Sequence, residues 1–77
     1  MSKMRFGKYI VADPEVCHGE LTFDGTRVPV ETVLSYLTRG MTVDEVPKHW
    51  PRVSRAAAMA ALRLAKEALV AKHRVTE

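Results

Sequence analysis

Apolar and polar positions change period near residue 30, from short alternating runs to the spacing of helices. Residues 8–12 form a β-branched and aromatic run, and residues 20–23 alternate polar and apolar side chains. Residues 27–28 continue the alternation after a turn at residues 24–26, which contains Asp-Gly. We therefore predict short strands and a hairpin across this turn.

The first predicted helix begins at Val30. Its apolar residues recur at the spacing of one helix face, and they are Val30, Val33, Leu34 and Leu37. Arg39 supplies a cation in the last turn, and Gly40 follows as a residue that commonly ends helices. We predict a helix of about three turns that Gly40 ends.

A second, shorter helix is predicted directly afterwards. Residues 42–45 form a capping box, in which Thr42 and Glu45 satisfy backbone amides at a helix start. Pro47 removes an amide and crowds the preceding turn, and Pro51 stops any continuation, so this helix is limited to one or two turns. Its expected buried residues are Val43, Val46 and Trp50.

The third predicted helix is the longest. Ser54 is a suitable N-cap, and residues 55–73 contain no glycine or proline but many alanines, leucines, lysines and arginines. A helix of this length measures roughly 28 Å. We expect residues 74–77 to fray at its end.

These elements predict a single, mostly α domain. Residues 1–7 show no clear period and are expected to be flexible unless a partner orders them. Residues 8–29 supply short strands and a hairpin, and residues 30–73 supply three helices. Two short helices before a long basic one have the outline of a helix-turn-helix, whose last helix lies in the major groove of DNA.

The segment that joins the strands to the helices is interpreted as a structural junction. Gly25 permits the turn, Thr26 is a turn residue, and Pro29 starts the first helix at a fixed backbone angle. Arg27 is expected to clamp the turn by a salt bridge or hydrogen bonds. The alternative is that Thr26 and Arg27 bind an anion.

The third helix carries a basic stripe, formed by Arg55, Met59, Arg63, Lys66, Val70 and His73. If this helix enters a DNA groove, its first residues and the cations before it contact phosphates or guanine edges. The predicted DNA-binding residues are Lys48, Arg52, Ser54, Arg55, Met59, Arg63 and Lys66. The alternative is a basic helix face that is simply solvated.

The apolar side of the same helix is wider than the two short helices can cover. Its uncovered residues are expected to be Leu64, Ala68, Leu69 and Val70. Three kinds of cover are open: the N-terminal hairpin folded back over the helix, a second copy of the chain, or a different protein. Alanine-rich surface lets helices approach closely, which suits a dimer.

Composition and charge narrow the class of protein. The hydrophobic fraction of 47% is normal for a globular protein, but a chain of 77 residues has a marginal core, and small chains often gain stability from a partner. The net charge of +3 permits a nucleic-acid or acidic-protein partner. With no apolar run long enough to span a membrane and no signal peptide, we expect a cytoplasmic protein without membrane contact.

Candidate chemistry is sparse. The single cysteine, Cys17, excludes an intrachain disulfide and is interpreted as a packing residue. His18 adjoins it, but adjacent side chains rarely converge on one ion, so no metal site is predicted. No nucleophile and base pair or phosphate loop is present, and we predict neither an enzyme nor a cofactor or small-molecule substrate.

Several motifs resemble the prokaryotic family catalogued as domain of unknown function 433. They are DPEVC at residues 13–17, Gly19, GTRVPV at residues 25–30, Gly40, TVDE at residues 42–45, and Trp50-Pro51. The resemblance spans roughly residues 9–68. The chain departs from the family pattern at His18, where a second glycine is usual, and at Pro47, where an aliphatic residue is common.

This resemblance implies a helical domain related to helix-turn-helix proteins. It also implies an antitoxin role, because many members of the family are antitoxins encoded beside a PIN-like ribonuclease toxin. By that analogy the chain would neutralise a toxin nuclease and, as a homodimer, bind its own promoter DNA. The alternative hypothesis is a protein-interaction module without DNA binding that acts as an accessory subunit of a partner enzyme. An RNA-binding domain is disfavoured because aromatic stacking residues are few.

Overall fold

The chain folds into a small antiparallel sheet followed by three helices. A computed structural model describes residues 3–76, so the expectations for residues 1, 2 and 77 lie outside the described residues. The elements are β1 (Met4–Phe6), β2 (Ile10–Ala12), the 3-10 turn η1 (Cys17–Gly19), β3 (Leu21–Phe23), α1 (Val30–Thr38), α2 (Val46–His49) and α3 (Arg55–Thr76). The predicted fold class is confirmed.

The sheet contains one strand that was not predicted. β1 pairs with β2, and β2 pairs with β3, all antiparallel. The expectation that residues 1–7 lack fixed structure is therefore wrong for Met4–Phe6. The guanidinium of Arg5 also bonds the carboxylate of Asp24 at 2.8 Å, which ties β1 to the turn after β3.

One face of the sheet is entirely apolar. Residues that pair directly across strands share a face, and the pairs Phe6–Ile10, Ile10–Phe23, Met4–Ala12 and Ala12–Leu21 all lie on the same side. Ile10 and Phe23 are buried against the helices, whereas Met4, Phe6 and Leu21 are exposed. The helices therefore cover only the inner half of this face.

The predicted hairpin after β3 exists in reduced form. The Phe23 amide donates to the Val28 carbonyl at 3.1 Å, and a single bridge joins Thr22 to Pro29. The residues at 27–28 do not form a strand of their own. Pro29 is the N-cap of α1, one position before the first helical residue.

α1 ends as the sequence predicts. Gly40 has a φ of 112°, which favours glycine. The Gly40 amide donates to the Leu37 carbonyl, and the Met41 amide donates to the Tyr36 carbonyl, at 3.2 and 3.1 Å. These two bonds are the Schellman pattern, which satisfies the last carbonyls of a helix.

α2 is a single turn, within the predicted limit. The capping box forms: the Thr42 amide donates to Glu45 Oε1 at 2.8 Å, and the Glu45 amide donates to Thr42 Oγ1 at 3.3 Å. The capping box lies in a short turn that precedes the helix, and α2 itself starts at Val46. Pro47 stands near the start of α2, where a missing amide is tolerated, so it does not interrupt the helix.

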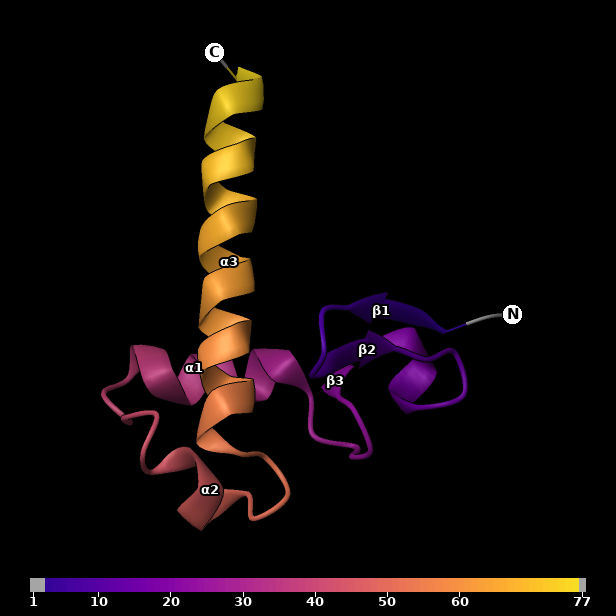
Figure 1. The fold of residues 1–77 in the computed structure, drawn as a ribbon, viewed down its shortest axis with the longest axis vertical. Coiled ribbons are helices and arrows are strands. Elements are labelled where there is room, and N and C mark those ends of the chain that lie inside the picture. Colours follow the sequence, from indigo (N-terminus) through magenta and orange to yellow (C-terminus); the bar gives the residue numbers. More distant parts are fainter. Residues whose placement is uncertain (1–2, 77) are drawn as a thin grey trace.

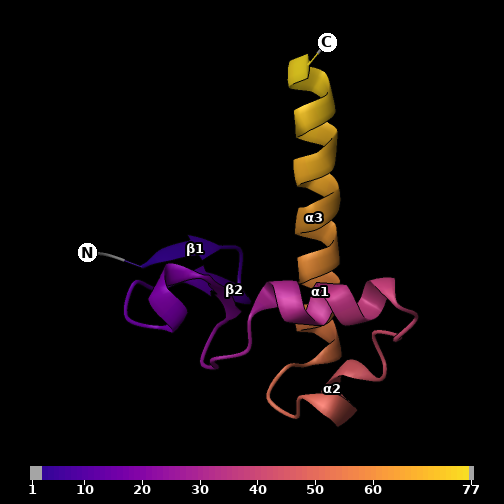
Figure 2. The same cartoon turned by 180° about the vertical axis from the view of Figure 1, so that it is seen from behind.

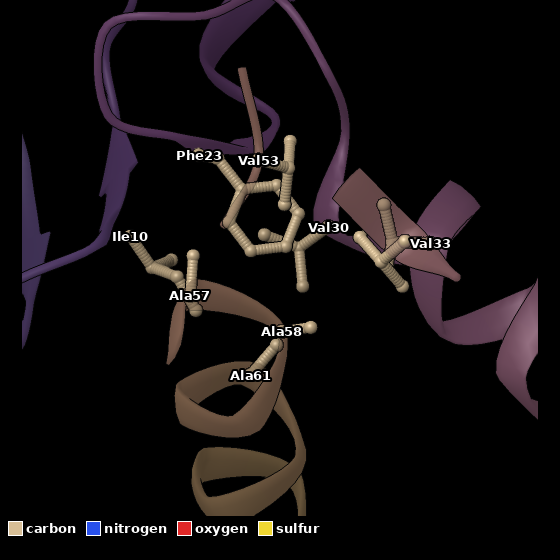
Figure 3. Packing of buried hydrophobic residues seen from close by; sticks show 9 residues of the cluster. Ile10, Phe23, Val30, Val33, Val53, Ala57, Ala58 and Ala61 are labelled. Carbon is tan, nitrogen blue, oxygen red and sulfur yellow. The ribbon is translucent and has the colours of Figure 1, made fainter. Parts of the chain in front are cut away.

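The core lies where α1 crosses the first half of α3 (Figures 1 and 2). Phe23 from the sheet and Val30 and Val33 from α1 converge on Ala58 of α3 (Figure 3). Val46 and Val53 are fully buried beside them. From Leu62 onward α3 has no buried residue among its described side chains, and it continues to Thr76, past the predicted end.

The molecule is flat and L-shaped. Its extents are 40 × 35 × 18 Å. α3 forms the long arm, and the sheet with η1 forms the short arm to one side (Figure 1). The second half of α3 stands clear of every other element in both views (Figures 1 and 2).

Candidate functional site

The start of α3 is fixed by its cap and by the segment before it. Ser54 Oγ accepts the Ala57 amide at 3.0 Å, which confirms the predicted N-cap. Val53 is fully buried and its amide donates to the Trp50 carbonyl at 2.9 Å. The connection between α2 and α3 is therefore held against the core, and the residues that flank it have defined positions.

Three aromatic rings reinforce this connection. The Tyr36 ring lies 5.4 Å from His49 and 5.3 Å from Trp50, and the His49 and Trp50 rings are 4.4 Å apart. They join α1 to the end of α2. Of the three residues predicted to be buried, Val46 is buried, whereas Trp50 and Val43 pack against the core and are only partly buried. The parts of Tyr36 and His49 were not predicted, because their contact depends on how α2 folds back onto α1.

Most of the predicted DNA-binding residues share one exposed surface. Arg55, Met59, Arg63 and Lys66 lie on the side of α3 opposite to its buried alanines, and Ser54 caps the same end. Lys48 and Arg52 are exposed just before the helix. We call these seven residues the basic face.

The cations of the basic face differ in their partners. Arg55 Nε bonds Asp44 Oδ1 at 2.8 Å, in an exposed ion pair of the kind that stabilises little. Among the described residues, Lys48, Arg52, Arg63 and Lys66 form no ion pair. Four cations are therefore available to an anionic partner, and Arg55 is held by a carboxylate.

Arg27 does not clamp the turn, contrary to the prediction. Its guanidinium is exposed and makes no hydrogen bond or ion pair within the described part of the chain. Thr26 holds the turn instead: its hydroxyl donates to the Phe23 carbonyl at 2.7 Å and accepts the Val28 amide at 3.0 Å. Gly25 has a φ of 80°, as its predicted turn role requires.

A hollow of about 740 Å³ separates the turn at residues 24–28 from residues 49–52. Arg27 and Arg52 line it from these opposite sides, and Lys3 adds a third cation. Asp13 and Asp24 also line it, and Arg5 holds the pKa of Asp24 below its ordinary value by a hydrogen bond and by its charge. The hollow thus carries both signs of charge, and Arg27 joins the candidate binding residues.

An apolar groove of about 470 Å³ occupies the inner corner of the L. We call it the corner groove; its lining residues come from the sheet, α1 and α3 and are Phe6, Ile10, Leu21, Val30, Leu34, Ala61, Leu64, Ala65, Glu67 and Ala68. Of the predicted interface residues, Leu64 and Ala68 line it. Leu69 lies at its edge and is 69% exposed, while Val70 points to the opposite side of α3.

Within residues 3–76 no group of three or more His, Cys, Asp and Glu side chains is placed to hold a metal ion. No helix in that range is long and apolar enough to cross a membrane.

Cys17 lies beside the Arg27 carbonyl, with Sγ at 3.6 Å from the oxygen, so it takes part in packing the loop before β3.

Comparison with known proteins gives one match. The family described as "Protein of unknown function (DUF433)" matches residues 10–65, which runs from β2 through the first half of α3. No curated protein and no solved structure matches. The matched region contains the core, the turn with Arg27, and the basic face except Lys66.

Proposed function

Because the chain belongs to the DUF433 family, whose description states no function, we propose from the geometry that it is a DNA-binding regulator of the antitoxin type. The basic face carries this proposal: it has four exposed cations without ion-pair partners in the described residues. Lys48 and Arg52 precede the capped start of a long helix, and Arg63 and Lys66 lie along its exposed side. Such a surface suits the phosphates of duplex DNA, with α3 approaching the major groove.

The position of the basic face supports the same role. The core uses Ala57, Ala58 and Ala61, so Arg63 and Lys66 point away from it on the other side of α3. The buried Val53 and the aromatic contacts of Trp50 fix the connection that presents Arg52. A cation held in a defined position loses less conformational entropy when it binds.

The toxin-binding part of the proposal depends on the family resemblance, which implies a PIN-like ribonuclease as the protein partner. An antitoxin of this type represses its own promoter as a homodimer and acts in the cytoplasm. Co-expression with the product of a neighbouring gene, followed by co-purification, tests this part. This part would be contradicted if the neighbouring gene encodes no nuclease and no protein co-purifies with the chain.

DNA binding is tested by fluorescence anisotropy on a duplex from upstream of the gene, between about 50 and 200 mM salt. We expect affinity to fall steeply with salt, because bound cations release counterions from phosphates. Arg52→Ala combined with Arg63→Ala should weaken binding and reduce the slope of log K against log salt by about two. Lys8→Ala, which removes one cation from the turn between β1 and β2, should change binding little.

A protein-interaction module without DNA binding is the second candidate, and the corner groove favours it. Its lining is apolar except for Glu67, which suits an apolar helix rather than a nucleic acid. Salt-independent or absent DNA binding, together with a stable protein complex, would favour this candidate over the first.

A further inference from the structure

The inner corner of the L exposes a continuous apolar surface. The corner groove opens onto the outer half of the sheet, where Met4, Phe6 and Leu21 are 62%, 36% and 40% exposed. These three side chains share the apolar sheet face with the buried Ile10 and Phe23. A small protein that leaves such a surface bare gains stability when a partner covers it.

The second half of α3 is the other uncovered part. Ala65 and Ala68 line the corner groove but remain exposed, and Leu69 is 69% exposed. The end of the helix stands clear of the other elements in both views (Figures 1 and 2). A single helix of this length is only marginally stable in water unless an apolar side packs against something. The chain thus presents an apolar groove and, directly beyond it, a helical segment that no other element supports.

We propose that the corner groove is the interface between two copies of this chain. A two-fold axis would set the α3 helices antiparallel, so that the second half of each α3 lies in the groove and over the sheet arm of its partner. One symmetric contact then covers both exposed parts in both copies. A different protein would have to supply a matching helix, whereas here the chain already contains it.

The flat shape permits this arrangement. In Figure 1 the sheet arm leaves α3 at its lower half, and the upper half has open space on the same side. Two such molecules, related by a half-turn within the plane of the figure, interlock. Each long arm then fills the corner of the other.

Charge is compatible with the antiparallel direction. Glu67 is the only acidic residue of α3 and lines the groove. In the antiparallel pair it lies near the second half of the other helix, whose net charge is positive. The remaining groove side chains are apolar, so the positive net charge of each copy lies mainly outside the contact.

The required area is attainable. A stable interface buries about 800 Å² per partner, about a seventh of the 5642 Å² accessible surface of this chain. Both arms of the L contribute to the proposed contact. This interface would form the homodimer of the proposed function. The proposal uses no DNA contact, so it can be tested without DNA.

The first test is the mass in solution, measured by size-exclusion chromatography with light scattering at about 100 μM, a concentration well above that needed for micromolar affinity. We expect twice the chain mass of 8.6 kDa for the unmodified protein. Ala68→Glu and Leu21→Glu each place a charge in the contact and should give monomers. Val70→Glu, on the opposite side of α3, is the matched control and should remain dimeric.

Circular dichroism on each variant checks that the fold is retained, which the exposure of all three positions leads us to expect. If the unmodified protein is monomeric, the proposal is wrong. This holds even if a different protein is found to bind the groove. A dimer that persists in both Ala68→Glu and Leu21→Glu would overturn it as well. Loss of DNA binding in a protein that is still dimeric would count only against the proposed DNA function.

The second test is the direction of the helices. Two chains, Leu21→Cys and Lys72→Cys, each with Cys17→Ser, are mixed and oxidised. The antiparallel arrangement predicts a mixed disulfide between them, because the end of one α3 lies over the partner's sheet arm. Lys72→Cys that links only to itself would indicate parallel helices and contradict the proposed arrangement.

Discussion

At the scale of single residues, the turn at residues 24–28 shows the limit of charge-based reasoning. The sequence suggested that Arg27 holds the turn, because a guanidinium can form several hydrogen bonds. A threonine hydroxyl does so instead, since Thr26 is placed to donate to Phe23 and accept from Val28. Short side chains that reach their own backbone stabilise tight turns, whereas long ones extend into solvent.

Thr26→Val and Arg27→Ala should therefore separate structure from binding. Thr26→Val removes two hydrogen bonds in a partly buried turn and should lower the free energy of unfolding by about 1–2 kcal/mol. Arg27→Ala should change it by less than about 0.5 kcal/mol, as for other exposed residues. Urea unfolding followed by circular dichroism measures both. A large loss of stability in Arg27→Ala would show that Arg27 does hold the turn.

At the scale of elements, the helix ends were predictable because their determinants are local. Gly40, the capping box at residues 42–45 and Ser54 each act on amides or carbonyls within a few positions along the chain. β1 was missed because three residues are too few to show a period, and their pairing with β2 is a tertiary contact. The exposure of Arg27 at the edge of the hollow is likewise a matter of tertiary arrangement, which no local pattern contains.

The capping box before α2 makes a prediction about pH. Hydrogen bonds from the backbone amide and the hydroxyl of Thr42 lower the pKa of Glu45 below its ordinary value of 4.5. A lowered folded-state pKa means that the unfolded chain takes up the proton more readily. This contribution to stability is therefore present above about pH 4.5 and is lost as the pH falls through the lowered pKa.

Glu45→Gln should keep the capping geometry and lose this pH dependence. Between pH 6 and pH 3, we expect the melting temperature of the unmodified protein to fall more than that of the variant. The variant keeps a smaller dependence, because Asp24 also has a lowered pKa, caused first by its hydrogen bond to Arg5. Glu15→Gln, at an exposed carboxylate without a hydrogen bond in the described residues, should follow the unmodified profile. Parallel curves for all three proteins would contradict the role of Glu45.

At the scale of the whole molecule, the uneven distribution of the core is the main feature. The sequence showed that the apolar side of the third helix exceeds what two short helices cover, and the structure confirms exposure at Ala68 and Leu69. The sequence left three kinds of cover open, because the apolar spacing along the third helix is the same whichever of them covers it. The direction of the sheet arm decides against the folded-back hairpin, since the strands reach only as far as Leu64 and Ala68.

A core confined to one half of α3 makes stability depend on association, if the corner groove joins two copies. Association that involves only the folded state raises apparent stability by mass action, so the melting temperature should rise with protein concentration. For a domain of this size we expect about 4 °C for each tenfold increase. Ala68→Glu should melt at one temperature throughout, and Val70→Glu should follow the unmodified protein.

Since the measurement compares each protein with itself at several concentrations, a direct effect of the substitution on the helix shifts the whole curve and leaves its slope unchanged. A flat curve for the unmodified protein between about 5 and 500 μM would mean that the exposed half of α3 stands alone in solution.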